Sequence, residues 1–215
     1  SVLYQFMRAT TMAVFFVLAG WAALMSLRSR TPGRFVQERA TRLLLPLVVG
    51  VVLFGSIIKY IELSHGRDIG LHGFRLVEAM QIPFLDFFPR NLTHLNQISW
   101  SHLWFLGYLF LISVALMPLM LALARHRPSF VVPIALTVYL PAPMMAAALV
   151  AFDGYWPFLP NLVSDWGNVI YFALCFVIGA GLAAWPGFEE RLGSEAPRLL
   201  ALMLLAFAGV VLYGE

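Results

Sequence analysis

The segment RTPGRFVQERATRLLLPLVVG, residues 30–50, joins a cluster of arginines to a long apolar run. Arg30, Arg34, Arg39 and Arg42 fall within thirteen residues, and the last of them precedes three leucines. Basic residues beside an apolar run either hold a loop on the cytoplasmic side of a membrane or hold an anion at the membrane surface. The two interpretations are compatible, and the rest of the sequence has to be examined to weigh them.

Local signals within this segment predict a helix that enters the apolar run. Thr31 is a candidate N-cap, Pro32 suits a first helical position, and the helix is expected to start near Arg34. Arg39 and Arg42 are then i and i+3, which makes them neighbours about 5–6 Å apart on one face. Two guanidinium groups at this spacing can bind a diphosphate, or two adjacent phosphates, through paired hydrogen bonds.

Two further features of the segment leave its role open. Pro46 lies four residues after Arg42, so the carbonyl of Arg42 loses its usual helical donor and the helix is expected to kink there. Alternatively, Arg34 and Arg42 pair with Glu38, which is four residues from each, and all the charges serve only to fix topology. The spacing alone does not exclude either interpretation.

The composition places the chain in a membrane. Of its 215 residues, 61% are hydrophobic and only 12% are charged, whereas a soluble domain carries roughly 25% charged residues. Mean hydropathy is +0.83. The apolar runs are about 17–22 residues long, which suits helices that cross a bilayer. We therefore predict an all-α, polytopic transmembrane helix bundle of about six spans, at approximately 3–27, 43–63, 103–124, 130–151, 168–185 and 197–213.

The distribution of Lys and Arg predicts the orientation of the spans. Loops 28–42, 125–129 and 186–196, with Arg198 just after the last, hold nine of the fourteen Lys and Arg residues and are expected to be cytoplasmic. The long segment 64–102 is then outside. The formal charge of +3 does not indicate nucleic acid, because the basic residues lie where cytoplasmic loops are expected.

A second candidate site is the stretch SWSHLWFLGYLF, residues 99–110, at the predicted outer end of a span. An imidazole such as that of His102 could act as an acid or base, or donate to a sugar hydroxyl. Trp100 and Trp104 could line a sugar site, but they are equally what an interfacial aromatic belt requires, and spacing alone favours the belt.

Some classes of function are disfavoured by what the sequence lacks. His65, His72 and His94 are scattered without the spacing of metal ligands, so we expect no metal site. No Asp, Glu, Lys or Arg occurs at residues 43–58, 103–124, 130–151, 168–185 and 199–213, and Arg8 is the one charge well inside the first span. Since ion-coupled transporters commonly place ionisable groups near the membrane midplane, a transporter is disfavoured.

Four segments, in this order, resemble the integral-membrane acyltransferase family 3, and in particular its branch of the bacterial glucan-biosynthesis protein C. The similarity covers about residues 6–184. The segments are MAVFFVLAGW, FVQERATRLLLPL, SHLWFLGYLF and WGNVIYFALCFVIGAGL.

This resemblance implies a bacterial inner-membrane enzyme of about ten helices. Such an enzyme moves an acyl group, succinyl or acetyl, from cytoplasmic acyl-CoA to a hydroxyl of a periplasmic or cell-surface carbohydrate, without a metal. In the family the paired arginines are assigned to the phosphates of the donor, which implies that role for Arg39 and Arg42, with Arg34 beside them.

At the other membrane face, His102 is the expected catalytic residue on this chain, and Trp104 and Trp100 are expected to bind the acceptor. The family's main catalytic histidine belongs to a helix that would precede Ser1. Residues 1–215 are therefore expected to be one partial domain that is inactive alone, with an upstream helix and downstream helices missing. The alternatives are a transporter of carbohydrates or lipid intermediates, and a non-catalytic membrane scaffold in which the arginines only set topology.

Overall fold

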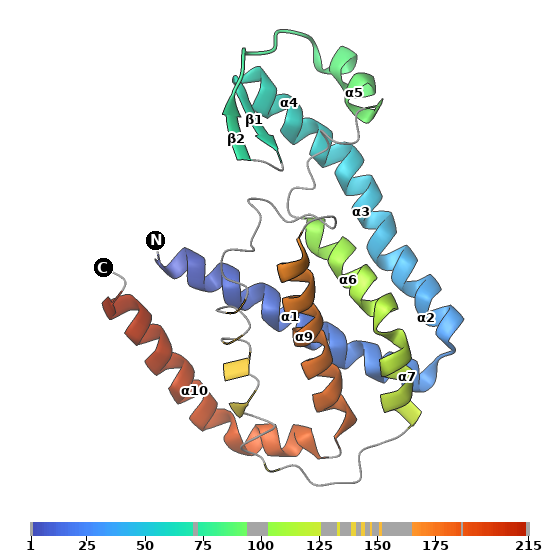
Figure 1. Cartoon of the computed structure of the whole chain (residues 1–215), viewed down its shortest axis with the longest axis vertical. Helices are drawn as coiled ribbons and strands as arrows, with labels where there is room; N and C mark the ends of the chain where they lie inside the picture. Colours follow the sequence, from blue (N-terminus) through green and yellow to red (C-terminus); the bar gives the residue numbers. More distant parts are fainter. Residues whose placement is uncertain are drawn as a thin grey trace. The chain divides into compact units, whose positions relative to one another are not determined.

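The computed structural model describes residues 2–70, 73–93, 103–125, 165–185 and 187–213, with a few positions between 133 and 151; within these ranges, side chains are described from residue 11 to residue 209, apart from residues 70 and 189. Figure 1 shows a helical chain with one small hairpin. The helices are α1 (Val2–Ser29), α2 (Pro32–Arg39), α3 (Leu45–Gly50), α4 (Ser56–Ser64), α5 (Phe84–Thr93), α6 (Trp104–Ala115), α7 (Met117–Arg125), α9 (Trp166–Ala184) and α10 (Phe188–Tyr213).

Two π-helical turns, η1 (Ala40–Leu44) and η2 (Val51–Gly55), join α2, α3 and α4. Together they make one helix of 33 residues, Pro32–Ser64, which is about 50 Å long. Pro32 begins it, as the sequence predicts. Pro46 does not end it, because the helix widens just before the proline and the N–H of Leu45 bonds to the carbonyl of Ala40, five residues back.

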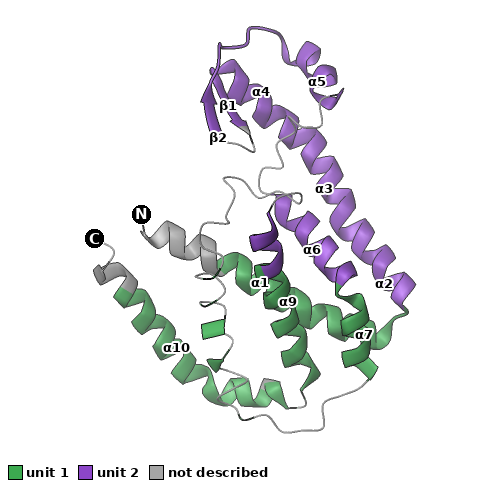
Figure 2. Cartoon of the chain, in the orientation of Figure 1, with its two compact units in different colours: residues 1–31, 116–151, 171–215 green, residues 32–115, 152–170 purple. Residues whose placement is uncertain are grey.

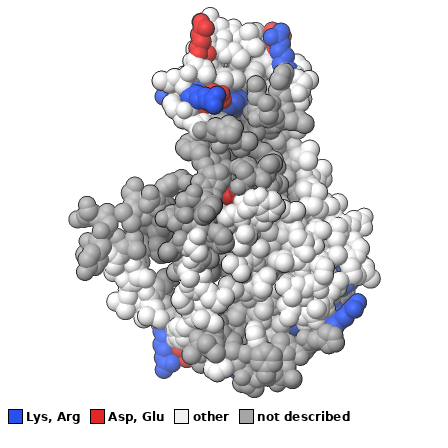
Figure 3. Space-filling view, in the orientation of Figure 1, with Lys and Arg blue, Asp and Glu red and all other residues white. Residues whose placement is uncertain are grey.

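Four described helices are long and apolar enough to cross a bilayer, and the bent pair α6 and α7 would make a fifth span. This confirms an all-α, multi-pass membrane protein. On the face drawn in Figure 3 the described charges form a few clusters separated by uncharged surface. The sixth predicted span, 130–151, lies mostly outside the described residues. The four helices are Thr11–Ser29, Pro32–Ser64, Trp166–Ala184 and Glu190–Gly209.

The chain divides into two compact units, each built from separate stretches of sequence (Figure 2). In the first unit, α1 packs against α9 with their backbones in contact. A Cβ at Gly20 would lie 1.9 Å from the carbonyl oxygen of Phe176, and one at Gly179 would lie 1.8 Å from that of Val17. Membrane helices use small residues in this way, since close approach maximises van der Waals packing where no hydrophobic effect is available.

The second unit contains the long helix Pro32–Ser64, helix α6, and a hairpin that polar side chains hold against α4. Strands β1 (Arg67–Gly70) and β2 (Gly73–Leu76) pair antiparallel. The buried Lys59 on α4 pairs with Glu62 and Asp68 and donates to the carbonyl of Ile69, which ties β1 to the helix. The long segment 64–102, which the sequence places outside the membrane, contains this hairpin and the amphipathic helix α5.

Helix α10 starts earlier than the sequence predicts, at Phe188 rather than after a loop that ends at residue 196. Pro197 lies inside it. The buried Glu195 accepts a hydrogen bond from Tyr139 at 2.8 Å and pairs with Arg198 at 2.9 Å, so the charge of this carboxylate is neutralised within the helix. A charged segment can therefore remain helical here.

Candidate functional site

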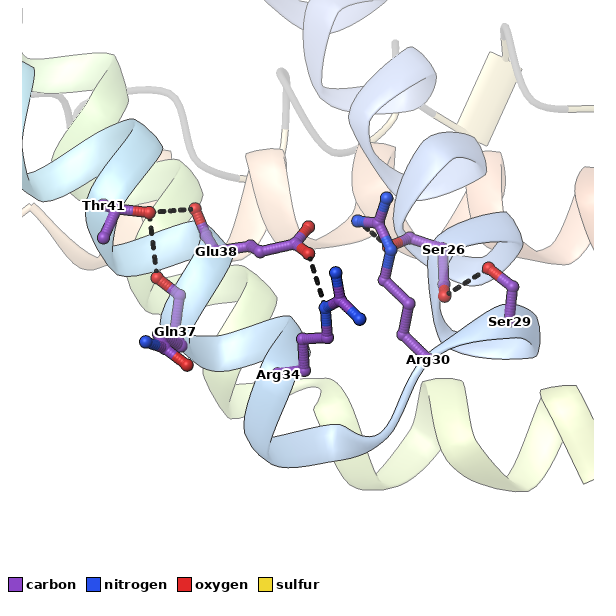
Figure 4. A network of polar contacts seen from close by, with 7 residues as sticks. All are labelled: Ser26, Ser29, Arg30, Arg34, Gln37, Glu38 and Thr41. Carbon is purple, nitrogen blue, oxygen red and sulfur yellow. Dashed lines mark hydrogen bonds and ion pairs between the residues drawn. The ribbon is translucent and has the colours of Figure 1, made fainter.

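The cluster of arginines lies at the start of the long helix. Arg34 pairs with Glu38 at 3.2 Å, which confirms that part of the expected pairing, although its side chain remains 72% exposed. Figure 4 shows the pair together with Thr41, whose hydroxyl donates to the carbonyls of Gln37 and Glu38 at 3.1 and 3.2 Å. The hydroxyl thus adds hydrogen bonds to the backbone where the helix widens into η1.

Arg39 and Arg42 have different surroundings. The guanidinium of Arg39 lies 5.1 Å from the centroid of the buried Phe35 ring, within the range of a cation–π contact, and Arg39 is half-buried. Arg42 is exposed and belongs to η1. Since π-helical turns are rare and occur frequently at functional sites, the turn that follows Arg39 and contains Arg42 is a candidate anion site.

A buried polar cluster lies on two other elements of the same unit. Asp165 precedes α9, is 1% exposed, and accepts hydrogen bonds from the Tyr108 hydroxyl at 2.5 Å and from the Asn168 side chain at 2.8 and 2.9 Å. The backbone N–H of Asn168 also points to it at 3.4 Å, so Asp165 is the N-cap of α9. Trp104 packs edge-on against Tyr108, with ring centroids 5.2 Å apart.

The packing of α6 against the long helix shows how far along that helix the Tyr108–Asp165 cluster lies. The Leu103 side chain lies against Gly50, and α6 then runs back along α3 towards η1. Gly50 follows Arg42 by eight residues, about 12 Å along the helix axis. Tyr108 lies one turn further towards the arginines than Trp104. The Tyr108–Asp165 cluster is therefore well inside the length of the 50 Å helix.

Only some of the predicted site residues belong to the part of the chain that the structure describes. Arg34, Arg39 and Arg42 share one helix, and Trp104 starts a helix beside the middle of that same helix rather than near its distal end. His102 and Trp100 lie outside the described residues. Asp165 and Tyr108 were not singled out as site residues from the sequence. An Asp directly before an apolar span signals an N-cap, but nothing in the sequence links it to a tyrosine on another helix.

No group of three or more His, Cys, Asp or Glu side chains within the described part of the chain could hold a metal ion. The arrangement offers instead an exposed, positively charged helix end and a buried carboxylate with its hydroxyl donor. Such groups can bind an anion at one place and orient a polar group at another.

These features define a multi-pass membrane protein with a basic helix end and a buried carboxylate cluster among its described residues. The chain belongs to the acyltransferase 3 family, because the family model, described as an acyltransferase domain, matches residues 1–215. It is therefore a membrane acyltransferase domain. No curated protein and no solved structure matched the chain significantly.

Proposed function

We propose that this domain, in a bacterial inner membrane, transfers an acyl group from acyl-CoA on the cytoplasmic side to a hydroxyl of a carbohydrate on the other side. The observation that carries the proposal is the pair Arg39, which ends α2, and Arg42, which lies in the π-helical turn that follows, at the basic end of a membrane helix. Guanidinium groups bind phosphates through paired, charge-assisted hydrogen bonds, and coenzyme A carries a diphosphate and a further phosphate.

In this proposal Arg39 and Arg42, with Arg34 beside them, hold the phosphates of the donor while the thioester arm extends into the apolar bundle. The acceptor hydroxyl attacks the thioester carbonyl, its proton passes to a base, and coenzyme A leaves as the thiol. His102 is the candidate base on this chain. Trp104 and Trp100 offer indole faces to a sugar ring.

The Tyr108–Asp165 cluster adds a positioning role to this scheme. A carboxylate that accepts the phenolic O–H makes the tyrosine oxygen a better hydrogen-bond acceptor, because hydrogen bonds in a chain polarise one another. Tyr108 and Asp165 lie at a depth between the arginines and the far end of the long helix. We assign them the orientation of the reacting groups rather than a covalent step.

Donor binding tests the proposal most directly. The full-length protein in lipid nanodiscs is titrated with acyl-CoA, and the Arg39→Ala plus Arg42→Ala variant is expected to bind about 10- to 100-fold more weakly, since two charge-assisted contacts are lost. Arg75→Ala is the matched control, because Arg75 is exposed on β2, in the hairpin that packs beside α4 at the other end of the long helix. Unchanged affinity in a double variant that still inserts into the membrane would contradict the proposed phosphate site.

A transporter of carbohydrates or lipid intermediates is the second candidate, and buried Asp165 favours it because ionisable groups inside membrane proteins commonly serve transport. Proteoliposomes separate the two functions. Acyl transfer to an internal or external acceptor without net solute movement supports the enzyme, whereas solute uptake that needs no acyl donor supports the transporter.

A further inference from the structure

A pocket of about 240 Å³ lies in the first unit, where the last turns of α1 meet the turn between α9 and α10. Three aromatic side chains, Trp21, Trp185 and Phe188, line it together with two opposite charges, Arg28 and Glu190. None of these residues belongs to the arginine turn or to the Tyr108–Asp165 cluster. The convergence of aromatic and charged groups on one small cavity is what a binding site for a small polar ligand requires.

The local sequence explains how the pocket forms. Trp21, Met25 and Arg28 are spaced four and three residues apart, so they follow one face of α1. Gly187 has φ of +71°, a conformation that glycine adopts without strain, and it reverses the chain so that Phe188 meets α1. The ring of Phe188, which is 5% exposed, lies 5.6 Å from that of Trp21 at a tilt of 49°.

The chemistry of the lining selects the class of ligand. Indole and phenyl faces stack on a heterocyclic base, and stacking of this kind contributes about 1–3 kcal/mol per base. The guanidinium of Arg28 binds a phosphate, and the exposed carboxylate of Glu190 can accept from an exocyclic amino group. The volume is below the roughly 300 Å³ at which pockets for drug-sized ligands begin, so it suits one ring system rather than a whole cofactor.

We infer that this pocket, within the first unit, binds an adenine nucleotide through its ring and one phosphate. The inference rests on the proposed function, which supplies a donor with an adenine nucleotide. It also agrees with the predicted topology, since Arg28 and the segment 186–196 both belong to loops expected in the cytoplasm, where the donor is soluble.

An interfacial aromatic belt is the simpler explanation for Trp and Arg near a helix end. Belt side chains face the lipid, whereas Phe188 is buried and Trp21 packs on it across two helices. This packing favours an enclosed ring over a side chain that faces lipid.

Binding of donor fragments tests the inference on the full-length protein in zwitterionic nanodiscs. Adenosine 3′,5′-bisphosphate, pantetheine and coenzyme A are each titrated by calorimetry. We expect Trp21→Leu plus Arg28→Ala to weaken binding of the bisphosphate and of coenzyme A about tenfold or more and to leave pantetheine unchanged. Trp21→Tyr keeps a stacking ring and should restore most of the affinity of the Trp21→Leu single variant, which separates lost stacking from misfolding. Phe15→Ala, 57% exposed on the same helix, and Arg125→Ala are the controls.

The outcomes distinguish this inference from the proposed function. If the pocket variants bind the bisphosphate as the wild type does, while Arg39→Ala plus Arg42→Ala loses coenzyme A, the pocket inference is wrong and the phosphate site stands. If the bisphosphate binds in a pocket-dependent way but no acyl transfer occurs, the pocket stands and the proposed function fails. Binding of anionic-lipid vesicles that depends on Trp21 and Arg28, with no binding of the bisphosphate, would overturn the nucleotide assignment.

Discussion

The hydroxyl of Tyr108 donates a 2.5 Å hydrogen bond to the carboxylate of Asp165, although 57 residues separate the two in sequence. Both side chains are almost completely buried, at 0% and 1% exposure. Asp165 also caps α9, but Asn or Ser would cap a helix about equally well without burying a charge, which is costly inside a membrane protein. The need for a cap therefore does not explain the carboxylate, whereas the proposed role in orienting reacting groups would.

Asp165→Asn separates these two roles. Asparagine keeps the capping oxygen, so we expect the unfolding temperature to change little, whereas loss of the charge should lower kcat about tenfold or more with the KM for acyl-CoA unchanged. Steady-state acyl transfer in proteoliposomes measures both constants. Tyr108→Phe keeps the ring packed on Trp104 and should reproduce the fall in kcat.

Asp165→Ala is the companion variant. It removes the cap as well as the charge, and we expect an additional stability loss of about 1–2 kcal/mol. If Asp165→Asn transfers acyl groups at the wild-type rate, Asp165 is a structural cap and the positioning role is wrong.

The contact between α1 and α9 depends on two glycines, and Gly20→Ala should disrupt it. The new Cβ would lie 1.9 Å from the carbonyl oxygen of Phe176, which is backbone and cannot move aside like a flexible side chain. The helices must separate, and overpacking of this kind costs about 1–3 kcal/mol. Thermal unfolding in detergent is expected to show the loss. Gly33→Ala, the same change in a helix where nothing lies within 4 Å of the new Cβ, should be neutral or slightly stabilising.

Sequence patterns predict the features that depend on neighbouring residues. The apolar runs give the membrane spans, and Pro32 gives the start of the long helix, because hydrophobic length and the missing N–H of proline act locally. The π-helical form of the turn before Pro46 is not predicted, since a kink and a widened turn both relieve the same lost hydrogen bond. A local pattern is compatible with either solution.

Contacts between residues that are far apart in the chain cannot be predicted from the sequence pattern. In the sequence, Lys59 is only a charge near the end of a predicted span. The folded hairpin shows that it forms an ion pair with Asp68 and donates a hydrogen bond to the carbonyl of Ile69. The partnership of Tyr108 with Asp165 is missed for the same reason. In both cases a buried polar group needs a partner, but the sequence does not say which one.

Lys59→Met should release the hairpin from α4. The lysine side chain is only 4% exposed, and its loss leaves the carboxylates of Glu62 and Asp68 without a counter-ion. Removing one partner of a buried ion pair costs about 3–5 kcal/mol, and we expect the low end because Asp68 is one-third exposed. Hydrogen exchange at Arg67–Gly70 and Gly73–Leu76 should quicken.

Arg34→Ala is the matched control for ion-pair loss, since its pair with Glu38 is largely exposed and is worth at most about 1 kcal/mol. Its effect on hairpin exchange should be negligible. Hairpin protection that survives Lys59→Met would show that backbone hydrogen bonds, such as that from Val77 to Gly66, hold the hairpin without the ion pairs.

Pro46→Ala tests whether the π-helical turn shapes the arginine site. Alanine restores an N–H that can bond to the carbonyl of Arg42, so the turn can return to α-helical spacing. A π turn accommodates about one extra residue, and its loss would rotate Arg39 and Arg34, which precede the turn, by about 100° relative to the rest of the helix. We expect the affinity for acyl-CoA to fall several-fold although the helix is no less stable, as calorimetric titration and thermal unfolding can measure. Pro89→Ala, an exposed proline inside α5, controls for a general effect of proline removal. Equal affinity of Pro46→Ala and wild type would mean that the arginines bind the donor, if at all, without help from the widened turn.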